Sequence, residues 1–189
     1  AVRSILLISK VPIRLIRTLA ADSSSRSSVR LAAVILRERY GVQPEFRSQS
    51  PDLDTMLSDC DAALIIGDPA LRLNPEQLPY ETLDLGAEWQ ALTNLPMVFA
   101  VWAGSGPLDS ANLEAIFSGS YDFGKAHIQQ IAESEFKRRG ITADLARQYL
   151  TRFIHYEIGK QERNGLTAFI ELAHLREQPS PLTIEHRFC

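Results

Sequence analysis

Residues 20–41, AADSSSRSSVRLAAVILRERYG, place five serines and one arginine directly before an apolar run with helical spacing. One interpretation is that a single serine caps the helix, worth about 0.5–2 kcal/mol over alanine, and the others lie in a loop; residue counts alone favour it. The other is that the hydroxyls and first-turn amides converge on one spot, as at helix N-termini that hold a carboxylate or phosphate. The candidate binding residues are Ser23, Ser24, Ser25, Arg26, Ser27 and Ser28, of which Arg26 adds a planar fork suited to carboxylates.

The stretch IIGDPAL, residues 65–71, places Gly67 and Asp68 at the C-terminal end of a buried strand. In open α/β sheets, ligands bind outside the carboxyl ends of strands, so we expect this turn and the serine turn to face the same crevice. Glycine, aspartate and proline are also what a plain tight turn needs. Asp68 is therefore a candidate catalytic carboxylate by location only.

Motifs for a metal, a nucleotide or a hydrolytic triad do not occur. The sequence contains no GxGxxG, no GxxxxGK[ST] and no GxSxG. The histidines have no metal-binding spacing, and neither cysteine completes a ligand set. We predict no metal and no cofactor. These residues are His127, His155, His174, His186, Cys60 and Cys189.

Composition narrows the class of protein further. The chain has 20 Lys and Arg against 23 Asp and Glu, with a net charge of −3 and no long block of either sign, which disfavours a nucleic-acid partner. No apolar run reaches the ~18 residues of a membrane span, so no membrane partner is expected. Two cysteines are too few for a disulfide framework, which predicts a cytoplasmic protein.

The elements that must position these residues alternate between strands and helices. Such alternation predicts an α/β fold with largely parallel pairing. Trp89 is expected in the core, whereas Trp102, at the end of a predicted buried strand, either packs in the core or walls a pocket. The predicted strands are 4–9, 18–22, 46–50, 62–67 and 97–102, and the predicted helices are 25–40, ended by Gly41, 51–58 and 85–92.

After Gly104 the pattern is almost entirely helical. Residues 110–140 have helical spacing with a break expected near 119–124, and the segments 143–154 and 162–175 follow. The tail from about residue 177 contains two prolines and little periodicity, and is expected to be irregular.

Five blocks, in order, are similar to the chorismate dehydratases of the futalosine route to menaquinone. The resemblance runs from about residue 2 to residue 175. The blocks are RSILLISKVPI, SSSRSSVRLAAVILRERYGVQPEF, DCDAALIIGDPAL, DLGAEWQALTNLPMVFAVWAG and YLTRFIHYEIGKQERNGLTAFIEL.

This resemblance implies a periplasmic-binding-protein-like fold of type II, with two α/β lobes around a ligand cleft. The chain would cross between the lobes at ILLISKVP and VFAVWAG, which makes residues 9–97 the middle lobe and residues 1–8 and 98–189 part of the first lobe. Family members carry a further N-terminal segment, so the first lobe is expected to be incomplete in this chain. We expect the encoded polypeptide to be longer, or the segment to arrive as a separate chain, and exposed apolar faces to favour association, such as a homo-oligomer.

The reaction implied by the resemblance is loss of water from chorismate, which leaves 3-[(1-carboxyvinyl)oxy]benzoate. The dianionic substrate would be bound by the serine turn, by Gly67, and by Ser9 and Trp102, one in each crossing. Asp68 or a carboxylate of the substrate itself would remove the proton. Three alternatives are open: a non-catalytic binding protein for a small carboxylate, the naphthoate synthase of the same pathway, and a partial domain with no activity of its own.

Overall fold

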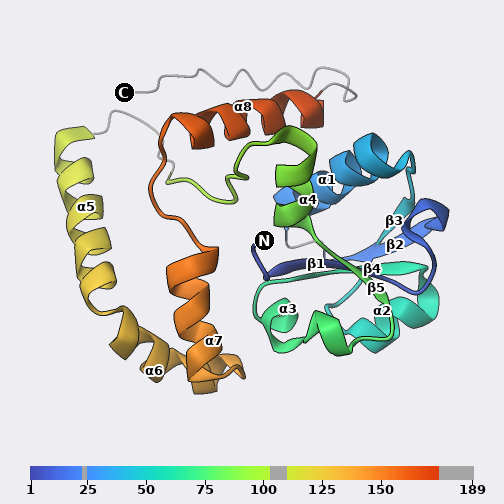
Figure 1. The fold of residues 1–189 in the computed structure, drawn as a ribbon, viewed down its shortest axis with the longest axis horizontal. Coiled ribbons are helices and arrows are strands. Elements are labelled where there is room, and N and C mark those ends of the chain that lie inside the picture. Colours follow the sequence, from blue (N-terminus) through green and yellow to red (C-terminus); the bar gives the residue numbers. More distant parts are fainter. Residues whose placement is uncertain (23–24, 103–109, 175–189) are drawn as a thin grey trace.

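The computed structural model describes residues 1–22, 25–102 and 110–174 (Figure 1). Its centre is an open five-stranded sheet in the order β3-β2-β4-β1-β5. The strands are β1 (Ile5–Ser9), β2 (Thr18–Ala21), β3 (Glu45–Ser48), β4 (Ala62–Ile66) and β5 (Glu81–Asp84). The predicted α/β class is confirmed.

Strand β1 runs antiparallel to both of its neighbours, β4 and β5, whereas β2 is parallel to β3 and to β4. The prediction of largely parallel pairing was therefore wrong for β1. Residues 10–17, with the short 3-10 turn η1 (Ile13–Leu15), connect β1 to β2. A parallel crossover needs a dozen or more residues, and this connection is shorter. Strand β2 therefore starts at the same end of the sheet at which β1 finishes.

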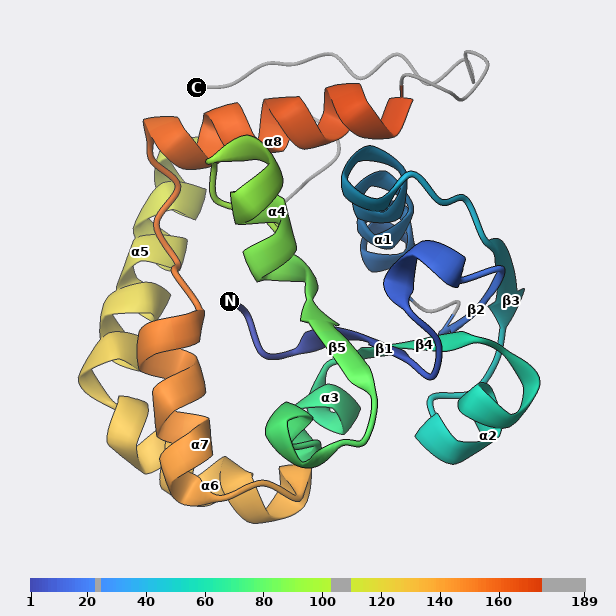
Figure 2. The same ribbon diagram turned by 45° about the vertical axis from the view of Figure 1, so that its right-hand side comes forward.

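Helices cover both faces of the sheet, which explains the continuous apolar runs of β1 and β4. Ile5 and Leu7 pack toward α1 (Arg26–Ile35) and α4 (Leu85–Thr93), whereas Leu6 and Ile8 pack toward α2 (Leu53–Asp59) and α3 (Asp68–Arg72). Figures 1 and 2 show these two helical layers on opposite sides of the strands.

The predicted ends of the first helix are close to the observed ones. Helix α1 begins after Ser25 and continues into one π-helical turn, η2 (Leu36–Tyr40), and Gly41 ends it with a φ of 72°. A left-handed residue at this position is where glycine carries no steric cost. Between α3 and β5 lies the 3-10 turn η3 (Pro75–Gln77).

Asp84 fastens the start of the chain to the sheet. Its carboxylate accepts hydrogen bonds from the amides of Val2 at 3.0 Å and Arg3 at 2.6 Å, and from the amide of Ala87 at 2.9 Å as the N-cap of α4. One side chain thereby orders both the approach to β1 and the beginning of α4.

The second half is helical, as predicted. Helices α5, α6 and α7 form an arm beside the sheet, and α8 returns to pack over α1 and α4 (Figure 2). Phe169 of α8 lies edge-on to Trp89, with ring centroids 5.8 Å apart, and Trp89 is fully buried as predicted. The elements are α5 (Ser110–Ala126), α6 (Ile128–Arg139), α7 (Ala143–Gln148), the π-helical turn η4 (Tyr149–Phe153) and α8 (Lys160–His174).

Two local predictions were wrong. Residues 97–102 form no strand, because no described strand pairs with them, and Trp102 is 82% exposed and stacks on Phe117 instead of joining the core. Helix α5 continues through Gly119 and Gly124, and the break falls at His127. Glycine lowers helix propensity by about 1 kcal/mol without forcing an end.

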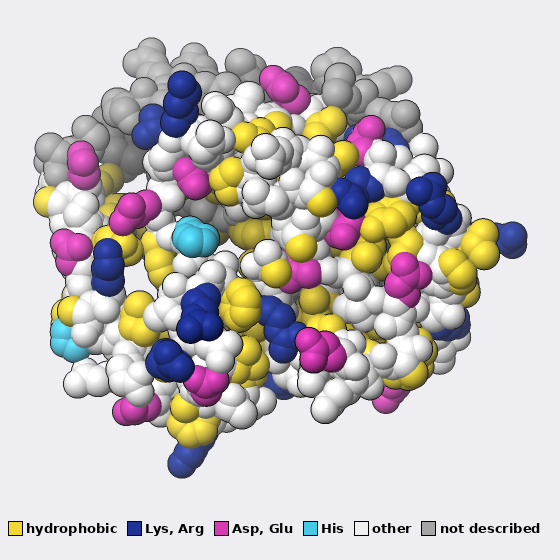
Figure 3. All heavy atoms as spheres, viewed as in Figure 1, with side chains coloured by type: hydrophobic (Ala, Val, Ile, Leu, Met, Phe, Trp, Pro, Cys, Tyr) yellow, Lys and Arg dark blue, Asp and Glu magenta, His cyan; other side chains and the backbone are white. Residues whose placement is uncertain are grey.

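The lobe boundaries stay predictions, although residues 5–8 lie inside the sheet of the 9–97 segment. The predicted irregular tail lies outside the described residues. No described helix has the length and apolar character required to cross a bilayer. On the face in Figure 3, positive and negative side chains are interspersed.

A substitution at Gly165 tests how closely α8 packs against Pro96. A Cβ at this position would lie 2.0 Å from the carbonyl oxygen of Pro96, so Gly165→Ala is expected to lower the free energy of unfolding by about 3 kcal/mol or displace α8. Gly124→Ala in α5 is the matched control, because a Cβ there meets nothing within 4 Å and is expected to stabilise by about 0.5–1 kcal/mol. Denaturant unfolding of both variants measures the contrast, and equal stabilities would contradict the close contact.

Asp61 provides a test of pH dependence. Hydrogen bonds from the Arg17 amide, and then from Thr18, lower the pKa of this carboxyl below its ordinary 3.8. Because the unfolded state then takes up the proton first as the pH falls, the stabilisation is complete well above pH 3.8 and disappears as the pH falls through the folded-state pKa. The free energy of unfolding, measured at several pH values, should be higher for wild type than for Asp61→Asn, and this difference should disappear in acid. A difference that stays constant with pH would contradict the prediction.

Candidate active site

A cavity of about 250 Å³ opens at the carboxyl end of β4. This volume lies below the ~300–1,000 Å³ of typical ligand pockets and suits a small ligand. Its polar groups are hydroxyls and backbone amides, and no Lys, Arg, Asp, Glu or His is among the described residues that line it. The lining consists of Val2, Ser4, Ile5, Ser25, Ser27, Ser28, Ile66, Gly67, Phe99, Tyr149 and Ile154.

The sheet order explains why these residues meet. The serine turn follows β2, Gly67 follows β4, and Ser4 precedes β1. Because β1 is antiparallel, its amino end lies beside the carboxyl ends of the other two strands. At this end of the sheet, the Gly67 amide donates a hydrogen bond to the Ser4 carbonyl at 2.7 Å.

The first turn of α1 forms one wall of the cavity. Ser25 is the N-cap, yet its hydroxyl donates to Ser28 Oγ at 2.9 Å and accepts no hydrogen bond from the helix. The first amide bonded along the helix is Val29, to the Ser25 carbonyl, so the amides of residues 26–28 have no partner within the helix. Such amides at the positive end of a helix dipole attract an anion.

The structure brings together four of the residues predicted for the site: Ser25, Ser27, Ser28 and Gly67. Arg26 is exposed and does not line the cavity. Ser23 and Ser24 lie outside the described residues. Binding roles for all of them stay predictions.

Two further predicted binding residues lie elsewhere. Ser9 is at the opposite end of β1, paired with Ala62, and its hydroxyl donates to the Val11 carbonyl at 2.7 Å. Trp102 is at the surface. Neither lines the cavity, because β1 separates Ser9 from it by the length of a strand and Trp102 stacks on α5.

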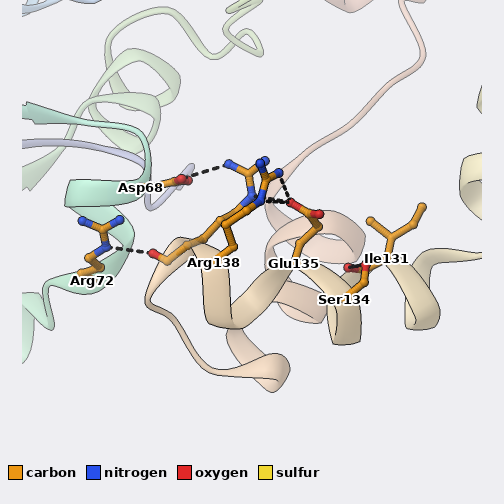
Figure 4. Close-up of polar contacts among 7 residues, drawn as sticks. Asp68, Arg72, Ile131, Ser134, Glu135 and Arg138 are labelled. Carbon is orange, nitrogen blue, oxygen red and sulfur yellow. Dashed lines mark hydrogen bonds and ion pairs between the residues drawn. The ribbon is translucent and has the colours of Figure 1, made fainter.

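Asp68 is engaged in an ion pair outside the cavity lining. Its Oδ2 lies 2.9 Å from Arg139 Nη1, and Arg72 Nε donates to the Arg139 carbonyl at 2.8 Å (Figure 4). Glu135 also pairs with Arg139, at 3.4 Å, and hydrogen bonding from Arg138 lowers the pKa of Glu135. We call Asp68, Arg72, Glu135 and Arg139 the α3–α6 clamp, since they fasten the helical arm to the end of β4.

Tyr149 and Ser4 are cavity residues that the sequence analysis did not identify. The Tyr149 hydroxyl donates to Ser4 Oγ at 3.0 Å, although the two residues are 145 positions apart. No spacing rule connects such distant positions. The one available signal was that Ser4 and Tyr149 each fall within a block of the family resemblance.

Comparison with known proteins shows which family the chain belongs to. A family model described as "Menaquinone biosynthesis" matches residues 1–175. The chain belongs to this family. It is also 32% identical, over 177 residues, to a chorismate dehydratase of Thermus thermophilus, an alignment that covers 85% of this chain. The chain spans 64% of the length of that relative.

Within this menaquinone-biosynthesis family member, no described group of three or more His, Cys, Asp or Glu side chains is arranged to hold a metal ion. The described lining of the cavity offers hydrogen bonds and a helix dipole to a ligand. These groups can seat and orient a carboxylate, and they contain no side chain that is a strong base at neutral pH.

The α3–α6 clamp gives a test of Asp68. An ion pair between side chains 33% and 44% exposed is expected to contribute about 0.2–1 kcal/mol, measured as the coupling in a double-mutant cycle of Asp68→Asn and Arg139→Gln. The coupling should shrink at high salt. Asp144→Asn with Arg147→Gln, a pair within α7, is the control cycle. A loss of turnover in Asp68→Asn at unchanged substrate affinity would instead place Asp68 in proton transfer.

Proposed function

We propose that the full-length protein removes water from chorismate to give 3-[(1-carboxyvinyl)oxy]benzoate, as a hydro-lyase of menaquinone biosynthesis. The observation that carries the proposal is the cavity at the end of β4, where the serine turn, Gly67 and Tyr149 meet. Support also comes from the 32% identity to a protein named chorismate dehydratase. The predicted cytoplasmic location and homo-oligomer are not needed for this proposal.

The first step of the proposed mechanism is binding of a substrate carboxylate at the start of α1. The amides of residues 26–28, which have no partner within the helix, and the hydroxyls of Ser27 and Ser28 donate to it. The apolar side chains of the lining, such as Ile66 and Phe99, contact the ring and exclude water. Exclusion of water strengthens each hydrogen bond to the bound anion.

The second step is elimination. A ring carbon loses a proton, the electron pair of that C–H bond forms a ring double bond, and the C–O bond breaks with its pair so that the hydroxyl departs as water. The product ring is aromatic, so the reaction is strongly downhill and orientation of the substrate accounts for much of the catalysis. Asp68 is held by Arg139, and the described residues of the lining include no carboxylate or imidazole, which favours a substrate carboxylate as the base.

Ser27 and Arg26 provide a matched pair of variants. Ser27→Ala is expected to weaken chorismate binding about ten- to a hundredfold, since a hydrogen bond to a charged group contributes about 1.5–3 kcal/mol. Arg26→Ala should change it little, because Arg26 is not among the residues that line the cavity. Calorimetric titration measures both affinities. A larger effect of Arg26→Ala would assign the carboxylate to the arginine.

The deciding assay is incubation of metal-stripped, full-length protein with chorismate while the ultraviolet spectrum reports formation of the aromatic ring. Conversion without added metal is expected. Tight binding with chorismate recovered unchanged would instead support a binding protein, and a requirement for metal would contradict the cofactor-free proposal. Turnover of a later pathway intermediate in place of chorismate would favour the naphthoate synthase.

A further inference from the structure

We infer that Tyr149, held by Ser4, hydrogen-bonds the substrate hydroxyl that leaves as water. The inference rests on the proposed function and assigns the second polar end of the same cavity. It concerns two residues from opposite ends of the chain whose side chains meet at 3.0 Å.

The cavity has two polar ends, and the sheet sets the distance between them. The serine turn follows β2 and Ser4 precedes β1, with β4 between these strands. Neighbouring strands are about 4.8 Å apart, so the two ends are separated by roughly 10 Å, two strand spacings. This separation suits a six-membered ring with one polar substituent at each end.

Charge distinguishes the two ends. The serine end has amides without a partner within the helix and the positive end of the α1 dipole, which favour a carboxylate. The Tyr149–Ser4 end has only neutral hydroxyls, which both donate and accept, and these suit a neutral hydroxyl. In chorismate the ring carboxylate and the leaving hydroxyl are on opposite ring carbons, so a carboxylate at Ser27 directs the hydroxyl toward Tyr149.

The chemical role follows from the elimination described above. As the C–O bond breaks, its electron pair moves to the departing oxygen, which becomes a stronger hydrogen-bond acceptor. The Tyr149 hydroxyl turns from Ser4 to donate to this oxygen, and the proton removed from the ring completes the water molecule. A hydrogen bond that strengthens as charge develops lowers the barrier more than it tightens binding.

The surrounding structure holds Tyr149 in place. It begins the π-helical turn η4, an irregularity that is frequent at functional sites. Helix α7, which ends at Gln148 directly before Tyr149, packs against α6, and the α3–α6 clamp fastens α6 beside Gly67. Ser4 is 5% exposed, so its hydroxyl is a fixed acceptor that sets the resting position of the Tyr149 ring.

The experiment compares Tyr149→Phe with Tyr156→Phe in the full-length protein. Tyr149→Phe is expected to lower kcat about ten- to a hundredfold, the loss of one hydrogen bond to a charged group. Its affinity for 3-[(1-carboxyvinyl)oxy]benzoate, which lacks the leaving hydroxyl, should equal that of wild type. Tyr156→Phe is the control, because Tyr156 lies outside the lining and bonds the Leu150 carbonyl. Far-ultraviolet circular dichroism confirms that both variants fold.

Each result has a distinct meaning. Normal kcat in Tyr149→Phe, with active wild type, overturns the inference and leaves the proposed function standing. Equal losses of kcat and product affinity also overturn it, because Tyr149 would then be only a wall of the cavity. Wild type that does not convert chorismate removes the proposed function itself, and this assay is made first. Ser4→Ala should lower kcat by a smaller factor, again at unchanged product affinity, as expected for a positioning residue.

Discussion

The reversed direction of β1 is the constraint on which the cavity depends. Strand β1 lies between β4 and β5 and runs against both. Its amino end therefore lies at the end of the sheet where β2 and β4 have their carboxyl ends. If β1 were parallel to β4, Ser9 would lie at that end of the sheet and Ser4 at the opposite end. Tyr149 would then have no partner there.

The cavity that results is lined by hydroxyls and by the start of α1, while the charged side chains of Asp68 and Arg72 near it are bonded to Arg139. Asp68 directly follows Gly67, and Arg72 is the last residue of the same helix, α3. Both nevertheless contact Arg139 of the helical arm. A cavity lined by neutral donors leaves no uncompensated buried charge when it is empty.

The α3–α6 clamp and helix α8 both attach the helical second half to the rest of the fold, as does the hydrogen bond between Tyr149 and Ser4. The α3–α6 clamp is exposed and weakly stabilising, whereas α8 is seated by close packing, with Gly165 against Pro96 and Phe169 against Trp89. Packing of this kind supplies most of the stability, since buried aromatic contact exceeds an exposed ion pair in area and energy. The clamp holds α6 beside the end of β4, and α7 packs against α6.

Much of the fold and part of the site follow from local sequence. Apolar runs at β1 and β4, the helical spacing of residues 25–40 and the glycine at position 41 each have a local physical cause, and all three elements were predicted. The family resemblance, too, was visible in the printed residues and is confirmed by the match over residues 1–175. The serine turn was identified because hydroxyl residues before a helix form a contiguous pattern.

Tertiary structure decided what no local pattern encodes. The direction of β1, the lack of a strand at residues 97–102 and the pairing of Asp68 with Arg139 depend on which partners are in reach once the chain has folded. Tyr149 and Ser4 meet across 145 positions for the same reason. Periodicity reports whether a residue faces a core, because burial is a property of its own element; it does not report the neighbour, because neighbours are set by how elements pack.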